Sequence, residues 1–368
     1  MHFLFWLCFA LVVHTYCGYP VWLWLLSRVK SLPILEDREE RTVSIIISAR
    51  NEESTLPAKL DNLRRMDYPT EKVEIVVVSD GSTDRTAAIL REQEWVVPVV
   101  LDRSNGKAAA LNEAVKHAHG DLLIFQDARQ LVEADCVSNL VRCFGDPAVG
   151  AVSGELLLES ASGEPHSALG IYWKIEKAVR KLESASGSVV GVTGAIYAIR
   201  RELFPKIPPG TILDDVYVPM QVARMGKRIV FQPKSIVRDR IFSGAAKEFS
   251  RKVRTLTGNY QLLRLAPWLL TPKNPLFFRF ISHKLLRLAV PFFLILMLLA
   301  LAWSSGRIYR GIFWLQIIFY LLGILGMVSS AASRFKPVSF AKTFLMLNAA
   351  ALLAFYNFIV GRGAASLW

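Results

Sequence analysis

The chain has 368 residues, of which 52% are hydrophobic, and it carries a formal net charge of +13. This length allows one sizeable domain with additional helices, and the apolar share exceeds that of an average soluble domain. The charge does not indicate nucleic-acid binding, because the sequence has neither zinc-finger spacing nor interleaved aromatic and basic residues. Anionic lipid and phosphate-bearing substrates explain it better.

The first apolar segment lies at the N-terminus. Residues 3–26 contain no charged residue and are long enough to cross a hydrocarbon layer of roughly 30 Å. A cleaved signal peptide is the alternative, but Arg28 and Lys30 follow the apolar run instead of preceding it, and no small-residue cleavage site comes after it. We therefore expect a transmembrane anchor at residues 1–28.

Three further apolar runs, at 288–303, 312–330 and 340–360, predict three transmembrane helices within residues 286–368. Buried helices of a soluble protein are the alternative. By the positive-inside rule, the basic residues that flank these runs place both termini outside and the segment from 28 to 284 in the cytosol. The basic residues on the predicted cytosolic side are Arg28, Lys30, Lys284, Arg287, Arg334, Lys336 and Lys342. Those on the predicted outer side are Arg307, Arg310 and Arg362.

Between these segments, apolar runs alternate with helical patterns. Strands are predicted at 43–48, 73–78, 96–101 and 122–126, with helices at 54–66 and from about residue 83. Fully apolar strands between helices are typical of a parallel sheet that is covered on both faces. The sequence thus predicts a doubly wound α/β domain at residues 29–240, which should bind ligands at the carboxyl ends of its strands.

Polar side chains follow three of these strands. Asn51 and Glu52 come after the first, Asp80 ends the second and Asp127 the fourth, so we expect them to converge on one cleft. Each has a structural alternative, since Asp80 alone could cap a helix and Asn51 could be a turn residue. The chain has no Walker loop and no dinucleotide glycine fingerprint, which argues against an ATPase or a dehydrogenase.

The cysteines give no sign of a metal site. No C-x-x-C pair is present, and the two cysteines in the predicted cytosolic region should stay reduced. We expect ordinary buried residues at Cys8, Cys17, Cys136 and Cys143.

Five motifs resemble, in order and spacing, the family 2 inverting glycosyltransferases of the GT-A fold. They are SARNE at 48–52, SDGSTD at 79–84, NGKAAALN at 105–112, QDAR at 126–129 and LDD at 213–215. The resemblance covers about residues 43 to 260 and implies a mixed, mostly parallel GT-A sheet. The membrane layout is similar to that of hyaluronan, chitin, cellulose and poly-N-acetylglucosamine synthases and of ceramide glucosyltransferase.

The resemblance implies a donor site for a nucleotide diphosphate sugar, with a UDP-sugar expected. Lys107 matches a basic residue near the diphosphate and ribose, although a solvated lysine at a helix start is the structural alternative. The positions that match the base and ribose site, where carboxylates and amides suit ring and hydroxyl donors, are Ala49, Asn51, Glu52 and Asp80.

Asp127 matches the first carboxylate of the family's D-x-D motif, which implies a bound Mg²⁺ or Mn²⁺. Arg129 occupies the second carboxylate position, where the family has an acid. Two interpretations follow. Either Asp127 and water hold the metal while Arg129 contacts phosphate directly, or the metal is dispensable, and we expect the metal to be retained.

The acceptor side is implied by two further matches. Asp215 matches the general base, with Asp214 in place of the usual Glu, although Asp215 could also be the N-cap of a helix at 216–225. Thr193 and Gly194 resemble the segment near the acceptor hydroxyl, where a glycine allows close backbone approach. On the donor side, Arg254 is the one residue retained from the Q-x-x-R-W motif of processive synthases, and the resemblance implies that it contacts the diphosphate. Because the tryptophan is missing, polymer synthesis is not implied.

The segment 241–285 mixes Lys and Arg with Trp268, Phe277, Phe278 and Phe280, which is typical of amphipathic helices lying in the membrane interface. We therefore expect a multi-pass protein of a bacterial inner membrane that transfers a sugar to a glycan or lipid acceptor, with no nucleic-acid partner. Polysaccharide or envelope-glycan synthesis is the leading hypothesis. The alternatives are a sphingolipid or polyprenyl-phosphate glycosyltransferase and, since Arg129 departs from the family, a nucleotide-sugar-binding pseudoenzyme.

Overall fold

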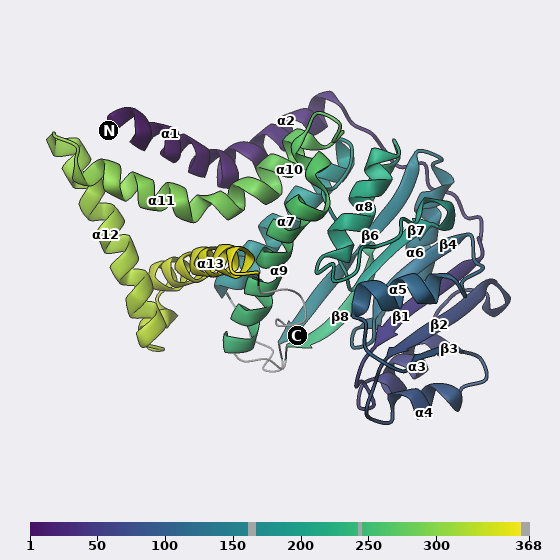
Figure 1. Cartoon of the computed structure of the whole chain (residues 1–368). Coiled ribbons are helices and arrows are strands. Elements are labelled where there is room, and N and C mark those ends of the chain that lie inside the picture. The colour runs from purple at the N-terminus through teal and green to yellow at the C-terminus, as the bar shows by residue number, and fades with distance from the viewer. Residues whose placement is uncertain (161–166, 242–244, 362–368) are drawn as a thin grey trace.

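One mixed sheet of eight strands forms the centre of the protein (Figure 1). The computed structural model describes residues 1–160, 167–241 and 245–361. Arg362 therefore lies outside the described residues, and so do parts of the predicted segments 241–285 and 286–368. The strand order is β3-β2-β1-β4-β7-β6-β8-β5. The strands are β1 (Val43–Ala49), β2 (Val73–Asp80), β3 (Val97–Leu101), β4 (Leu122–Asp127), β5 (Leu131–Val132), β6 (Val149–Ser160), β7 (Ile196–Arg200) and β8 (Arg228–Ile241).

The four predicted strands form the parallel half of this sheet. β1 pairs in parallel with β2 on one side and β4 on the other, and β3 continues the sheet beyond β2. In this register Ala49 lies opposite Ser79, and Ser48 lies opposite Asp127. The strands therefore end at one edge of the sheet, and the polar residues that follow them lie along that edge.

The other half makes the sheet mixed. β7 is antiparallel to both β4 and β6, whereas β6 and β8 are parallel, and the short β5 is antiparallel to β8. The sequence did not predict these four strands individually. Their mixture of directions confirms the fold class that the family resemblance implied.

Helices cover both faces of the sheet, each with its own apolar core. On one face, β1 and β4 pack against α3 (Leu56–Arg64), α4 (Thr86–Arg91) and α6 (Cys136–Arg142). On the other face lie α5 (Lys107–Val115) and α8 (Asp214–Arg224). Burial of each large aliphatic side chain contributes roughly 1.5–3 kcal/mol, and the parallel strands are apolar on both faces because both are covered. The helices predicted near 54, 83 and 216 are α3, α4 and α8.

Four helices are long and apolar enough to cross a membrane within the described chain. The first, His2–Val29, joins α1 (His2–Val13) to α2 (Tyr19–Val29) through a π-helical turn. The second, Phe277–Ala302, joins α10 (Phe277–Phe280) to α11 (Leu286–Ala302). It begins eleven residues before the predicted run at 288, so part of the predicted interfacial segment belongs to this apolar helix. The others are α12 (Arg307–Val328) and α13 (Lys336–Ile359).

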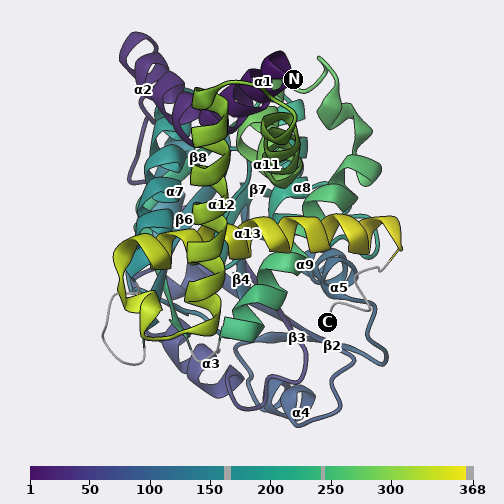
Figure 2. The ribbon, with the colours of Figure 1, turned by 90° about the vertical axis from the view of Figure 1, so that its left-hand side faces the viewer.

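The apolar helices do not all run in one direction. α1 packs beside α11 through Phe5, Cys8 and Met297, whereas α12 and α13 are steeply inclined to this pair and to each other (Figures 1 and 2). Membrane-crossing helices tilt by about 20° on average, and seldom beyond 40°. The described helices therefore do not form a single bundle of near-parallel spans.

Between the sheet and the apolar helices stand α7 (Ser167–Ala185) and α9 (Ala245–Leu265) (Figure 1). α9 packs against α11 and α13 through Tyr260, Leu288 and Ala354. The cysteines match the prediction except for one: Cys8, Cys136 and Cys143 are buried, but Cys17 is exposed. Cys17 lies in the apolar helix His2–Val29, so its exposed side chain is part of the apolar surface of that helix.

Candidate active site

Asp80 fixes the loop that leads into α5. Its buried carboxylate accepts hydrogen bonds from Ser104 Oγ at 2.8 Å, from the Asn105 amide at 2.8 Å and from the Gly106 amide at 3.0 Å. Gly81 is required beside it, because φ is +60° and a Cβ would lie 2.3 Å from the Ser104 nitrogen. The carboxylate predicted to hold base or ribose thus already organises the loop before Lys107.

The SARNE and SDGSTD loops are tied together at the same edge. Asn51 has a φ of 54°, and its Oδ1 accepts a hydrogen bond from the Thr83 amide at 2.8 Å. The Glu52 amide donates to Thr86 Oγ1 at 2.8 Å, and Ala49 is buried at the end of β1. A short amide side chain tolerates this left-handed conformation. The predicted nucleotide residues therefore form one connected platform.

Lys107 is held by two carboxylates. It is the first residue of α5, and its Nζ lies 2.9 Å from Asp127 Oδ1 and 3.7 Å from Asp214 Oδ2. Burial disfavours the charged amine, but Asp127 and Asp214 more than offset this and raise the pKa of Lys107 above its ordinary value. The solvated-lysine alternative is therefore wrong, and a fixed positive charge lies between the carboxylates of Asp127 and Asp214.

Asp214 and Asp215 begin α8. Leu213 is the N-cap, and no side chain caps the helix, so the N-cap alternative for Asp215 is wrong. Asp215 Oδ1 and Asp214 Oδ2 are buried without a hydrogen-bond partner among the described residues. Burial and the neighbouring Asp214 raise the pKa of Asp215 to about 6, against the opposing charges of Lys107 and Lys284. A carboxyl group with an unengaged oxygen and this pKa is suited to proton transfer near neutral pH.

Thr193 and Gly194 lie against the start of α8. A Cβ on Gly194 would be 3.2 Å from Asp215 Oδ2, and the Val192 amide donates to the Asp215 carbonyl at 2.9 Å. Thr193 Oγ1 accepts a hydrogen bond from Arg180 Nη1 at 3.1 Å. The structure thus brings the predicted acceptor segment next to the predicted base.

Arg254 lies on α9, which packs against the apolar helices α11 and α13. Burial lowers the pKa of Arg254, and the charges of Asp214, Asp127 and Asp215 oppose that shift, so the guanidinium lies within electrostatic reach of all three. The residue retained from the processive-synthase motif therefore belongs to the same cleft.

Comparison with known proteins agrees with this geometry. Residues 44–207 match the family model described as glycosyl transferase family 2. The chain carries a family 2 glycosyltransferase domain.

The relatives of this glycosyltransferase domain include poly-beta-1,6-N-acetyl-D-glucosamine synthases. The protein of Staphylococcus aureus is 26% identical over 243 residues, and the match covers 63% of this chain and 58% of the relative. That of Staphylococcus epidermidis is 23% identical over 245 residues, with the same coverage. The chain thus spans less than two thirds of the length of these relatives.

A solved structure is similar over almost the whole chain. It is a mannosyltransferase from Pyrobaculum calidifontis in complex with GDP-Man and Mn²⁺, which is 25% identical and has a TM-score of 0.72. The match covers 97% of this chain and 99% of the other. The likeness therefore extends beyond the glycosyltransferase domain to the apolar helices.

Arg129 forms an ion pair with an acid on β8. Its Nη2 lies 2.5 Å from Oδ2 of Asp239 on β8, and the same oxygen accepts a hydrogen bond from Gln130 Nε2 at 3.2 Å. Asp239 is only 5% exposed. The guanidinium of Arg129 therefore compensates a buried acid in this arrangement, and its predicted contact with phosphate stays a prediction.

Lys59 is a site residue that the sequence analysis missed. It is fully buried, and its Nζ donates to Gln126 Oε1 at 2.6 Å and to the Gln130 carbonyl at 2.7 Å, on either side of the Asp127 loop. Burial lowers the pKa of Lys59 to about 7. A signal was present, because Lys59 lies at helical spacing on the apolar face that Leu56, Leu60 and Leu63 form.

The site fits a divalent ion through one carboxylate. Among the described residues, no three His, Cys, Asp or Glu side chains gather as a protein-only cage. Asp127 is partly exposed at the strand edge, with Lys107 beside it. Because Mg²⁺ typically binds one or two carboxylates together with substrate phosphates, Asp127 and a donor diphosphate are a suitable ligand set.

Proposed function

We propose that this protein transfers a sugar, with inversion, from a nucleotide diphosphate sugar to an acceptor hydroxyl at a membrane, in polysaccharide or envelope-glycan synthesis. The observation that carries the proposal is Asp215, whose buried Oδ1 has no partner among the described residues and which lies beside Gly194 and the Lys107 charge. A purely structural aspartate at this position would be hydrogen-bonded.

The reaction follows from these positions. The acceptor oxygen attacks the anomeric carbon, its proton passes to Asp215, and the bond from the anomeric carbon to the diphosphate oxygen breaks. The nucleoside diphosphate leaves with that electron pair. Lys107 and Arg254 lie among the carboxylates of the cleft, where their positive charges stabilise the leaving diphosphate.

We propose that the platform of Asn51, Glu52 and Asp80 binds the nucleoside. The Pyrobaculum relative is a complex with GDP-Man, whereas the sequence resemblance favoured a UDP-sugar, so both donors belong in the test. The experiment is purification in detergent, incubation with a panel of UDP- and GDP-sugars, and measurement of nucleoside diphosphate release. Asp121→Asn changes an aspartate at the opposite end of β4 from Asp127. It is the matched control for substitutions of the aspartates in the candidate site. If no donor is consumed, even though one binds, the protein is a binding pseudoenzyme.

We further propose that Asp127 holds Mg²⁺ or Mn²⁺ together with the donor phosphates. A bound divalent ion supplies charge neutralisation for the leaving group. Mn²⁺ in the Pyrobaculum complex supports this assignment. EDTA should suppress activity and added Mn²⁺ or Mg²⁺ should restore it, while Asp127→Ala should be inactive at any metal concentration. Full activity in EDTA would remove the metal from the proposal.

We propose that the chain is an integral membrane protein with residues 31–284 on the cytoplasmic face. Exposed apolar side chains on α12, such as Trp314, Leu315 and Leu321, support contact with lipid. Cysteine labelling in sealed vesicles, with single cysteines at the ends of each apolar helix, measures which helices cross. Labelling of the glycosyltransferase domain from the extracytoplasmic side would overturn this topology.

A further inference from the structure

Tyr197 is a buried tyrosine on the sheet beneath the candidate active site. It lies on β7 and is 1% exposed, and its ring stacks on Phe125 of β4 with the ring centroids 4.8 Å apart. The two residues are partners in the antiparallel register, and Asp127 follows two positions after Phe125. Because side chains alternate along a strand, Tyr197 is on the side of the sheet where Lys107 pairs with Asp127.

The hydroxyl of Tyr197 has no hydrogen-bond partner among the described residues. Buried hydroxyl groups usually have one, because an unpaired polar group in the interior costs free energy. The ring itself is held by apolar neighbours, since Phe125 also stacks on Phe204 in the same core. A phenylalanine would make these ring contacts equally well. The packing of the sheet therefore gives no reason for the oxygen of Tyr197.

The charged groups that act on this hydroxyl are the carboxylates of the candidate active site. Burial and then the charges of Asp214, Asp215 and Asp127, in that order, raise the pKa of Tyr197 well above its ordinary value. The hydroxyl therefore keeps its proton and can donate it in a hydrogen bond. Asp214 Oδ2 is buried and also has no hydrogen-bond partner within the described chain. An unpaired donor and an unpaired acceptor thus lie within electrostatic reach of each other.

The charge that compensates Asp214 is that of Lys107. The Lys107 amine lies 2.9 Å from Asp127 Oδ1 but 3.7 Å from Asp214 Oδ2, which is too long for a hydrogen bond. The phosphate oxygens of a donor are strong, charged acceptors that compete for the same amine. When they engage Lys107, Asp214 is left as a buried carboxylate without its cation, which is unfavourable. A second donor next to Asp214 would offset that loss.

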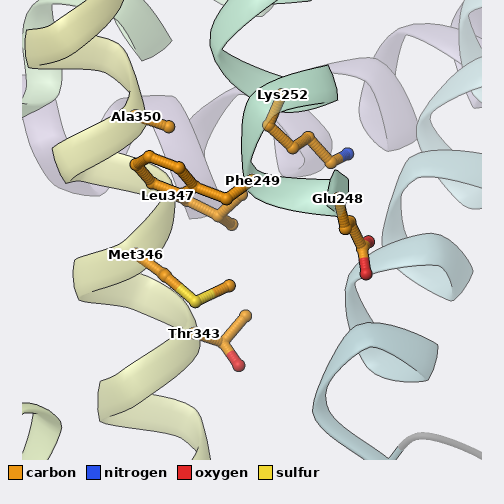
Figure 3. Close-up of a pocket in the computed structure, with 7 residues that line it drawn as sticks. All are labelled: Glu248, Phe249, Lys252, Thr343, Met346, Leu347 and Ala350. Atoms are coloured by element: carbon orange, nitrogen blue, oxygen red, sulfur yellow. The ribbon is translucent and has the colours of Figure 1, made fainter. Parts of the chain in front are cut away.

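The pocket between α9 and α13 does not have such a set of unpaired atoms (Figure 3). Its lining includes Phe249, Met346 and Leu347. None of the described side chains that line it has a buried nitrogen or oxygen without a hydrogen-bond partner. The unpaired atoms thus favour the surroundings of Asp214, and not this pocket, as the place where ligand binding changes the hydrogen bonds.

We propose that Tyr197 is a positioning residue of the active site, whose hydroxyl donates a hydrogen bond to Asp214 once the donor diphosphate draws Lys107 away from that carboxylate. This inference rests on the proposed nucleotide-sugar site and adds a residue to it. The exchange leaves Asp214 with a partner beside Asp215 while the donor is bound. Tight donor binding therefore depends on a hydroxyl that acts through Asp214 and does not touch the donor.

The test is isothermal titration of the full-length protein in detergent with UDP and with GDP. Tyr197→Phe removes only the oxygen and should weaken binding of the preferred nucleotide about tenfold, as expected when one hydrogen bond to a charged group is lost. Its melting temperature without nucleotide should not fall, because the hydroxyl has no partner to lose. In an Asp214→Ala background, which lacks the acceptor, the same substitution should change the affinity less than about twofold.

Tyr68→Phe is the matched control. Tyr68 is also buried, but its hydroxyl donates to the Arg41 carbonyl at 2.6 Å. This variant should have a lower melting temperature and an unchanged affinity for the nucleotide, which is the opposite of the result expected for Tyr197→Phe.

Three results would overturn the proposal for Tyr197. They are an unchanged nucleotide affinity in Tyr197→Phe, a lower melting temperature of that variant without nucleotide, and an equally large loss of affinity in the Asp214→Ala background. A wild-type protein that binds neither UDP nor GDP would instead refute the proposed donor site, and this inference with it. Because the titration needs no sugar transfer, the two failures are distinguishable.

Discussion

The two sides of the cleft differ in how their charged groups are satisfied. On the donor side, Asp80 accepts three hydrogen bonds from its own loop, and Asn51 bonds the neighbouring turn. On the proposed acceptor side, Asp214 and Asp215 each keep a buried oxygen without a hydrogen-bond partner among the described residues. The hydrogen bonds of the proposed donor side are therefore formed before any ligand arrives. The buried carboxylates of the proposed acceptor side need a ligand or a proton to satisfy their remaining oxygens.

This difference matches the demands on each side. A platform for a nucleotide benefits from loops that are already fixed, since less ordering entropy is lost on binding. A general base needs an oxygen that is not occupied, with a pKa near the working pH. Substitutions on the proposed donor side should consequently weaken donor binding, whereas substitutions of the proposed base should lower the rate of transfer.

The largest effect is expected at Asp215. Asp215→Asn should lower transfer by about 10² to 10⁴ because the proton acceptor is lost, while donor binding survives. The pKa of Asp215 is raised to about 6 in the fold, so its contribution to stability is present below its ordinary pKa and is lost as pH rises through about 6. Above pH 6 the variant should therefore be more stable by up to about 3 kcal/mol, because the pKa is raised by about two units and each unit corresponds to about 1.4 kcal/mol. Turnover assays and thermal melts measure both, and near-normal turnover would exclude Asp215 as the base.

On the donor side, Asp80→Asn should act through binding. The amide cannot accept all three hydrogen bonds, so the loop before Lys107 loses its anchor. We expect donor affinity to fall about 10- to 100-fold, since each hydrogen bond to a charged group contributes about 1.5–3 kcal/mol. Isothermal titration with the nucleoside diphosphate measures this. Asp102→Asn, exposed just after β3, is the control, and unchanged affinity in Asp80→Asn would contradict the positioning role.

Arg129 distinguishes the two interpretations of the altered D-x-D motif. Because Arg129 pairs with the buried Asp239, Arg129→Ala should lower the free energy of unfolding by about 1–3 kcal/mol and leave donor affinity nearly unchanged. The double variant Arg129→Ala/Asp239→Asn should recover part of that loss. Denaturant unfolding and nucleotide titration measure the two quantities. A drop in donor affinity at constant stability would restore the phosphate-contact interpretation.

The smallest effect is a shift in pH dependence. Activity should rise with pH around the Asp215 pKa of about 6, because the base acts when deprotonated. Asp214→Asn should move this midpoint to lower pH, since the Asp214 charge raises the pKa of Asp215. Lys284→Met should move it the opposite way, because the lysine charge lowers that pKa. Rate profiles from pH 4.5 to 8 measure both, and shifts of the same sign would contradict this electrostatic account.

Much of the donor side was predictable from the sequence. The apolar runs at 43–48, 73–78, 96–101 and 122–126 are β1 to β4, and their pairing places Asp80 and Asp127 at one edge. Parallel strands are buried on both faces, so they appear in the sequence as continuous apolar runs. The motifs that follow them then identify the glycosyltransferase domain at residues 44–207.

Only the tertiary structure decided which charges meet. Arg129 lies two residues from Asp127 but pairs with Asp239, and Lys107 of α5 pairs with Asp127 and Asp214. Ion pairs of this kind depend on how separate elements pack, and no local period in the sequence encodes them. The sequence by itself determined the four strands of the parallel half, the edge at which they end and the resemblance to the family. The state of Asp215, the proposed catalytic carboxylate, was decided by packing, because burial and neighbours from distant segments set its pKa.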